Sequence, residues 1–191
     1  YDVIRIDHFI GIVNYWSIPA DSQTAINGKW KKGPGKKLTK VIKKATKGAS
    51  IIAEDLGVVG DNVRALIENG ANEYLPHNYA SENCIVYGGT HDNDTIVGYY
   101  KEKSDEEIKF VKQYLGISKK EDLPRAMIRC GYASIAKTAV FQMQDILALD
   151  NSARMNCPST VGTNWKWRML PNQFTADHIR FLKKMCRLYN R

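Results

Sequence analysis

Acidic side chains follow three separate apolar runs of the sequence, at the point where each run ends. The runs are V-I-R-I at 3–6, followed by Asp7, S-I-I-A at 50–53, followed by Glu54, and C-I-V-Y at 84–87, which leads to Asp92. Chemistry at a glycosidic bond needs such carboxylates, because one attacks the anomeric carbon and another donates a proton to the leaving oxygen. A third can stabilise the positive charge that develops on the sugar ring. The alternative is that each acid only caps the helix that follows its strand.

Basic residues stand beside two of these acids. Arg5 precedes Asp7 by two residues, and His91 is next to Asp92. Side chains at positions i and i+2 of a strand point to the same face, so the Arg5 guanidinium can orient the Asp7 carboxylate. Such neighbours favour a shared reaction site over independent helix caps.

Metal chemistry is an open alternative at one of these positions. The sequence D-N-D at 92–94 matches the D-x-D pattern by which some nucleotide-sugar transferases hold a divalent metal. His91 with Asp92 could begin a zinc site, but no second histidine falls at ligand spacing. The cysteines form no C-x-x-C pair, which argues against a cysteine zinc site and a dense disulfide framework. They are Cys84, Cys130, Cys157 and Cys186.

The elements that must position these residues alternate between strands and helices. Besides the three apolar runs, residues 138–143 read as a fourth strand. Four separate helices are predicted, each by its own signal. The first has apolar residues at helical spacing over 38–45, and the second has Asp61 as an N-cap. The third begins with a capping box from Ser104 to Glu107, and the fourth has Pro124 in its first turn. Thr175 is expected to cap a last helix, and residues 150–173 read as a loop on the side of the site. Alternation of this kind predicts an α/β fold with a parallel sheet, whose polar strand ends form the catalytic rim of a (β/α) barrel.

Length and composition bound the possible classes of protein. The 191 residues are 43% apolar and 25% charged, which is typical of a globular chain and not of a disordered one. No apolar run approaches the ~18 residues needed to cross a bilayer. There is no secretory signal pattern, so a cytoplasmic-type compartment with reduced thiols is expected. Because the chain opens on Tyr1 and at once reads as a strand, we expect it to be a piece of a longer protein.

The net charge of +8 comes from one segment. Residues 29–47 contain nine lysines and no acid, and the rest of the chain is close to neutral. One interpretation is a site for nucleic acid or another anionic surface. The other is a solvated helix face, since the segment has a single aromatic residue, Trp30, and no arginine to bind phosphates in a bidentate way.

A set of longer motifs runs through the sequence. They are R-I-D-H-F at 5–9, Y-W-x-I-P-A at 15–20, A-I-N-G-x-W at 25–30, G-P-G at 33–35, I-I-A-E-D-L-G at 51–57, N-E-Y-L-P-H-N-Y at 72–79, T-H-D-N-D-T at 90–95, Q-D-I-L at 144–147, R-M-N-x-P at 154–158 and N-W-x-W-R at 164–168. Together they resemble the amylomaltase, or disproportionating enzyme, family of 4-α-glucanotransferases, and they occur in the order of that family.

The resemblance implies a role for individual residues. Asp7 would be the nucleophile, Glu54 the general acid and base, and Asp92 the stabiliser of the transition state. The residues implied in substrate binding are Arg5, His91, Asn156, Tyr74, His77 and Asn78. Tryptophans 16, 30, 165 and 167 could be platforms for sugar rings or ordinary core residues.

The family resemblance also implies the reaction. A segment of α-1,4-glucan from a donor maltodextrin forms a covalent glucosyl-enzyme and passes, with retention, to the 4-hydroxyl of an acceptor sugar. No metal, nucleotide cofactor, membrane or nucleic acid is implied. The expected place is starch, glycogen or maltodextrin metabolism in a bacterial cytoplasm or a plastid.

The chain is shorter than the resemblance requires. A complete (β/α)₈ barrel needs ~250 residues, and this chain begins at what the family would count as its fourth strand. Between Leu66 and Asn72 a further strand is expected to be deleted. The prediction is therefore one partial catalytic domain over 1–191, an incomplete TIM-type barrel of about four parallel strands with flanking helices. Two other functions stay open: an inactive glucan-binding remnant and a basic nucleic-acid-binding protein.

Overall fold

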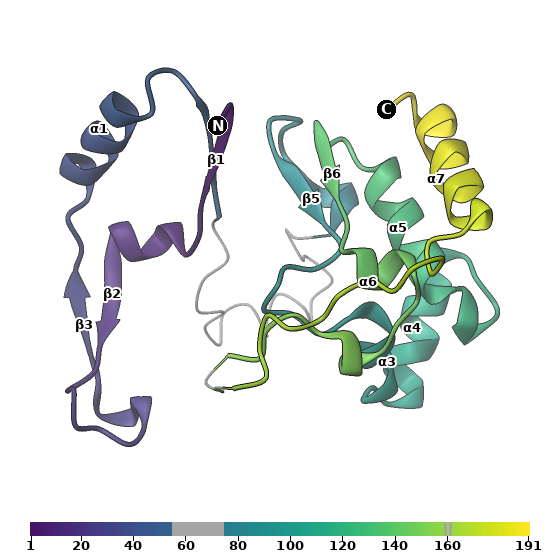
Figure 1. Ribbon diagram of the computed structural model, residues 1–191, viewed down its shortest axis with the longest axis horizontal. Coiled ribbons are helices and arrows are strands. Elements are labelled where there is room, and N and C mark those ends of the chain that lie inside the picture. The colour runs from purple at the N-terminus through teal and green to yellow at the C-terminus, as the bar shows by residue number, and fades with distance from the viewer. Residues whose placement is uncertain (55–74, 159, 161) are drawn as a thin grey trace. The chain divides into compact units, whose positions relative to one another are not determined.

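The computed structural model of the chain describes residues 1–54, 75–158, 160 and 162–191 (Figure 1). Contacts divide the chain into two compact units, residues 1–69 and 70–191. Each unit contains one pair of parallel strands. The α/β class is therefore confirmed, and the described residues contain two separate pairs of parallel strands.

The first unit is built on strands β1 (Val3–Ile6) and β4 (Ser50–Ala53), which pair in parallel. Both are rich in isoleucine, whose branched side chain favours the strand conformation. The register joins Val3 to Ser50 and Ile6 to Ala53, so the two strands end side by side. Helix α1 (Lys36–Ala45) lies between them in the sequence and contains the expected helical segment 38–45, beginning two residues before it.

An antiparallel hairpin in the same unit is absent from the sequence prediction. It joins β2 (Asn14–Ser17) to β3 (Lys29–Lys32), with Trp16 directly opposite Trp30. The two indole rings pack edge to face, 5.3 Å apart, which is a cross-strand pair of the kind that stabilises hairpins. Three lysines in the four residues of β3 obscure its strand character, because lysine is depleted in strands.

In its described residues, the second unit combines strands β5 (Ile85–Tyr87) and β6 (Thr138–Val140) with five α-helices. The helices are α3 (Ile96–Lys101), α4 (Asp105–Leu115), α5 (Leu123–Ala133), α6 (Met143–Ile146) and α7 (Ala176–Tyr189). Four buried side chains form the main core cluster: Ile96, Tyr100, Ile108 and Leu123. The core therefore joins α3, α4 and α5.

Three of the signals for the start of a helix are confirmed. Ser104 and Glu107 form the expected capping box at the start of α4, and Thr175 caps α7 together with His178. Pro124 lies in the first turn of α5. Residues 151–153 form a short 3₁₀ turn, and the other described residues of 150–173 are irregular as predicted.

The expected strand over 138–143 is wrong at its end. Strand β6 stops at Val140, and Met143 begins α6. The chain must turn there because Asp145 sends its carboxylate to the backbone amide of Ile96, which satisfies the start of α3. Phe141 contributes by stacking on the ring of Tyr132.

Two further expectations concern the rest of the chain. The helix capped by Asp61 and the deletion between Leu66 and Asn72 lie outside the described residues.

All four cysteines are free thiols. None of the helices that the structure describes is long and apolar enough to cross a membrane.

Candidate active site

The predicted nucleophile and acid follow neighbouring strands of the first unit. Ile6 pairs with Ala53, so Asp7 and Glu54 are the next residues of two parallel strands in register. Parallel strands lie about 4.8 Å apart. That spacing is close to the ~5–5.5 Å between the two carboxyl groups of retaining glycosidases. The register therefore suits a nucleophile and a proton donor.

Hydrogen bonds hold the Glu54 carboxyl group to the end of β1. Its Oε2 accepts a hydrogen bond from the backbone amide of His8 at 2.6 Å. The Glu54 amide donates to Ile6, and its carbonyl accepts from Phe9, each at 2.9 Å. His8 is in the left-handed conformation, with φ of 47°, which turns the chain so that its amide reaches Glu54. The end of β1 is thus shaped around this one glutamate.

Arg5 occupies the position expected of it. Its Nη2 lies 2.9 Å from Oδ1 of Asp7, an ion pair between a residue of β1 and the residue that follows the strand. The Asp7 side chain is about half exposed, at 52%, whereas the Arg5 side chain is only 26% exposed. The more buried guanidinium therefore fixes the direction of an accessible carboxylate.

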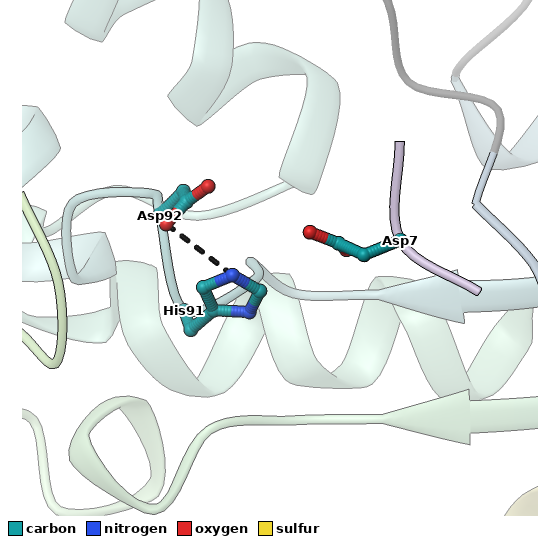
Figure 2. Close-up of side chains that lie close together, drawn as sticks. All are labelled: Asp7, His91 and Asp92. Atoms are coloured by element: carbon teal, nitrogen blue, oxygen red, sulfur yellow. Dashed lines mark ion pairs between the residues drawn. The ribbon is translucent and has the colours of Figure 1, made fainter. Parts of the chain in front are cut away.

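The predicted residues of the second unit lie on the loop after β5. His91 Nε2 is 3.3 Å from Oδ1 of Asp92 (Figure 2). Asn156, from the loop at 150–173, donates its side-chain amide to the same oxygen at 2.5 Å. Its backbone amide also donates to the carbonyl of His91. Three predicted site residues of one unit are thus brought together.

The second aspartate of the D-N-D sequence, Asp94, is bound by side chains of the 150–173 loop. Asp94 forms an ion pair with Arg154 and accepts a hydrogen bond from Asn151 at 3.1 Å. Arg154 also donates to the carbonyl of Asp92 at 2.6 Å. Since a cationic side chain already neutralises Asp94, this arrangement favours a loop anchor over the D-x-D metal site.

Trp165 covers the ring of His91. The two ring centroids are 5.2 Å apart, and the Trp165 backbone amide donates to Met155 at 2.7 Å. Trp165 is 54% exposed, so one part of the indole contacts histidine and another part faces solvent. This favours the platform interpretation over the core interpretation for this tryptophan.

The remaining predicted binding residues lie elsewhere in the second unit. His77 and Asn78 belong to a 3₁₀ turn at Pro76–Asn78, and His77 Nδ1 is 2.7 Å from the hydroxyl of Tyr114 on α4. Burial raises the pKa of Tyr114 to about 12, so its hydroxyl keeps its proton at neutral pH. Tyr74 lies outside the described residues.

Sequence reasoning missed the anchoring residues Asn151 and Arg154. Arg154 belongs to the R-M-N-x-P motif, so it was visible as part of a pattern but without a role. Asn151 had no signal in the sequence, because its function depends on a contact with residues more than fifty positions away. Both residues hold the 150–173 loop on the loop after β5.

Comparison with known proteins identifies the chain's relatives. A family model described as 4-alpha-glucanotransferase matches residues 1–173. The chain is 40% identical to the 4-alpha-glucanotransferase of Thermus thermophilus, over 97% of this chain and 41% of that protein. It is also 40% identical to the chloroplastic/amyloplastic 4-alpha-glucanotransferase DPE1 of Arabidopsis thaliana, over 100% of this chain and 36% of that protein. The chain thus spans about two fifths of the length of these relatives.

A third relative bears on the expected deletion. The match to the 4-alpha-glucanotransferase of Clostridium butyricum is 40% identical and extends over 208 residues, 17 more than the whole chain contains. Residues of that relative therefore have no counterpart here, in agreement with an internal deletion.

A solved structure gives the same result at the level of the fold. Amylomaltase from Streptococcus agalactiae, in complex with acarbose, matches with a TM-score of 0.86 and 36% identity. The match covers 100% of this chain and 42% of that one. Sequence motifs, family model and fold agree: the chain belongs to the 4-alpha-glucanotransferase family.

Proposed function

We propose that this chain is the part of a 4-α-glucanotransferase that carries its carboxylates, within an incomplete (β/α)₈ barrel. The observation that carries the proposal is the register of β1 and β4, which makes Asp7 and Glu54 neighbours at the ends of parallel strands. Family membership supports the choice of reaction. The donor is an α-1,4-glucan or maltooligosaccharide, and the acceptor is a second sugar.

In the first half of the reaction, a carboxylate oxygen of Asp7 attacks the anomeric carbon of the donor. The bond from that carbon to the leaving oxygen breaks, and Glu54 gives its proton to this oxygen. Arg5 keeps the attacking carboxylate in place through their ion pair. Asp92, oriented by His91 and Asn156, stabilises the positive charge that develops on the sugar.

In the second half, the 4-hydroxyl of the acceptor attacks the same carbon. Its proton passes to Glu54, and the ester bond to Asp7 breaks, so both carboxyl groups return to their starting states. Transfer prevails over hydrolysis only if the acceptor sugar excludes water from the glucosyl-enzyme. An exposed indole such as Trp165 would help to hold that sugar by stacking on its apolar face.

The test is disproportionation of maltotriose by the chain. We expect release of glucose together with longer maltodextrins, and loss of both products in Asp7→Asn and Glu54→Gln. The second substitution keeps an oxygen that can accept from His8, so the fold at β1 is preserved. Glu121→Gln, at an exposed position of the second unit, is the matched control and should remain active. Turnover at the wild-type rate in either carboxylate variant would remove the assignment.

A second candidate function is binding of glucan without turnover. The observation that favours it is the exposed indole of Trp165 beside His91, which could bind a sugar ring without any reaction. It predicts binding of maltodextrin with no products from maltotriose.

A further inference from the structure

The lysine-rich segment of the first unit is not used by the reaction described above. All nine of its lysines are exposed, on β3, on α1 and in the turn after α1. Their positions in these elements decide whether they form one surface or point in all directions.

On α1 the lysines share one face. At 100° per residue, the five lysines of the helix fall within about 120° of its circumference. They are Lys36, Lys37, Lys40, Lys43 and Lys44. The apolar residues Leu38, Val41 and Ile42 lie on the opposite side. The helix therefore presents a row of lysines along one face, and α1 itself contains no acidic residue.

On the hairpin, the register places a lysine on the face that carries both indoles. Trp30 and Lys32 are two residues apart on β3, and Trp16 is opposite Trp30, so all three side chains share a face. Trp16 is 40% exposed and Trp30 is 54% exposed. Two half-exposed indoles next to a cation offer apolar ring surface and positive charge to the same ligand.

The position of Trp16 is fixed. Its Nε1 donates a hydrogen bond to the carbonyl of Ala25 at 2.8 Å. Gly28 makes room for the ring, since a Cβ at this position would lie 2.2 Å from the same nitrogen. The indole pair is thus a preorganised surface, which reduces the entropy lost on binding.

A short segment of the chain connects the hairpin to the helix. Only residues 33–35 separate β3 from α1. The amides of Gly33 and Gly35 donate to the carbonyls of Val13 and Ile12, at 2.7 and 2.8 Å. The row of lysines on α1 therefore begins directly after the hairpin. We call Trp16, Trp30, Lys32, Lys36, Lys40 and Lys43 the lysine–indole surface.

We propose that the lysine–indole surface binds an α-glucan that carries phosphate groups. The indoles would stack on the apolar faces of glucose rings, and the ammonium groups would bind the phosphates as point charges. This inference rests on the proposed function, because the glucan part of the ligand comes from it. Single-stranded nucleic acid also combines rings with phosphates, but one pair of indoles offers few stacking positions, and residues 29–47 contain no arginine.

The test compares two maltodextrins of equal length, one phosphorylated and one neutral, by calorimetric titration of the full chain. We expect the phosphorylated ligand to bind at least about tenfold more tightly at low salt, with an advantage that falls as salt rises. The triple variant Lys36→Gln, Lys40→Gln and Lys43→Gln should lose this advantage and keep its affinity for the neutral ligand. Glutamine has nearly the helix propensity of lysine, so α1 is preserved.

The matched control removes the same charge from other helices. It is the triple variant Lys109→Gln, Lys183→Gln and Lys184→Gln, at exposed positions of α4 and α7. It should bind the phosphorylated glucan as the wild type does. Trp30→Ala should weaken binding of both glucans by between about two- and tenfold.

Three results would overturn the proposal. They are equal affinity for the two maltodextrins, an equal loss in the control variant, and tighter binding of single-stranded DNA of matched charge. Maltotriose turnover is measured separately on each variant. If the chain binds the phosphorylated glucan but makes no products from maltotriose, this inference stands and only the proposed transfer reaction is contradicted.

Discussion

The side-chain amide of Asn156 donates a 2.5 Å hydrogen bond to the Asp92 carboxylate, across 64 residues of sequence. His91 lies 3.3 Å from the same oxygen. The carboxylate is therefore held from one side by its own loop and from the other by the loop at 150–173. Asp92 lies on an irregular segment after β5, so these contacts with side chains orient its carboxylate.

Substitutions of Asn156 should distinguish two effects: loss of the hydrogen bond that orients the Asp92 carboxylate, and repulsion by a second negative charge beside it. Asn156→Ala removes the hydrogen bond to Asp92 but not the backbone bond to His91. We expect maltotriose transfer to fall about tenfold and the free energy of unfolding to fall by about 1 kcal/mol. Asn156→Asp should destabilise the chain more, since it places a like charge beside Asp92. Urea unfolding at neutral pH provides the measurement, and equal stability of Asn156→Asp and wild type would contradict it.

Glu107 should make the stability of the second unit depend on pH. Hydrogen bonds from Lys103 and from the Ser104 amide and hydroxyl lower the pKa of this carboxyl group to about 2. The unfolded chain binds a proton to it at about 4.5. The stabilisation is therefore complete above that value and is lost as the pH falls from about 4.5 to about 2.

The Glu107 prediction is checked by unfolding titrations across this pH window. In Glu107→Gln the loss of stability with falling pH should become smaller. Lys103→Met should shift the remaining loss to higher pH, because the lysine is the largest cause of the lowered pKa. An unchanged pH dependence in Glu107→Gln would show that the capping box does not act in this way.

The elements that could be predicted are those whose signal is local. The isoleucines of β4, the capping box at Ser104 and the spacing within α1 each depend on a few adjacent residues. The hairpin was missed because its stability comes from the pairing of Trp16 with Trp30, which a single strand does not reveal. The end of β6 was wrong for the same reason, since the turn depends on Asp145 reaching Ile96.

The residues of the candidate site also fall into those that a local sequence signal reveals and those that depend on distant contacts. Asp7 and Glu54 could be recognised because each follows a strand, and the pairing of those strands makes them neighbours. The family motif pointed to Asn156. The anchoring of Asp94 by Arg154 could not be predicted, since it needs the path of an irregular loop.

Asp145 is a buried carboxyl group whose charge should cost stability. Burial raises its pKa, and the hydrogen bond from the Ile96 amide offsets this only in part. No donor among the described residues reaches its Oδ2. A raised pKa in the folded state means that stability falls as the pH rises above the ordinary value of about 3.8.

Two substitutions of Asp145 should therefore have opposite effects. Asp145→Asn keeps an acceptor for Ile96 without the charge, so its unfolding free energy at pH 7 should exceed that of the wild type, and the two should converge in acid. Asp145→Ala leaves the Ile96 amide without its acceptor and should lose about 1–3 kcal/mol. Thermal and urea unfolding at acid and neutral pH would decide, and a destabilised Asp145→Asn at pH 7 would contradict the account.

Replacing Gly98 by alanine should destabilise the chain, whereas the same change in most helices stabilises it. In an exposed helix this change gains up to about 1 kcal/mol. In α3, however, a Cβ at position 98 would lie 1.9 Å from Oδ1 of Asn151. That oxygen accepts from the Thr95 amide, and the amide of the same side chain donates to Asp94. Gly98→Ala should therefore lower the free energy of unfolding by about 1–3 kcal/mol.

A double-mutant cycle tests whether the contact with Asn151 is the cause. Asn151→Ala removes the obstructing side chain, so Gly98→Ala should cost less in that background than in the wild type. In the double variant the intrinsic preference of alanine for the helix should become visible. Strictly additive losses, or a stabilised Gly98→Ala single variant, would show that the loop at 150–153 does not restrict position 98.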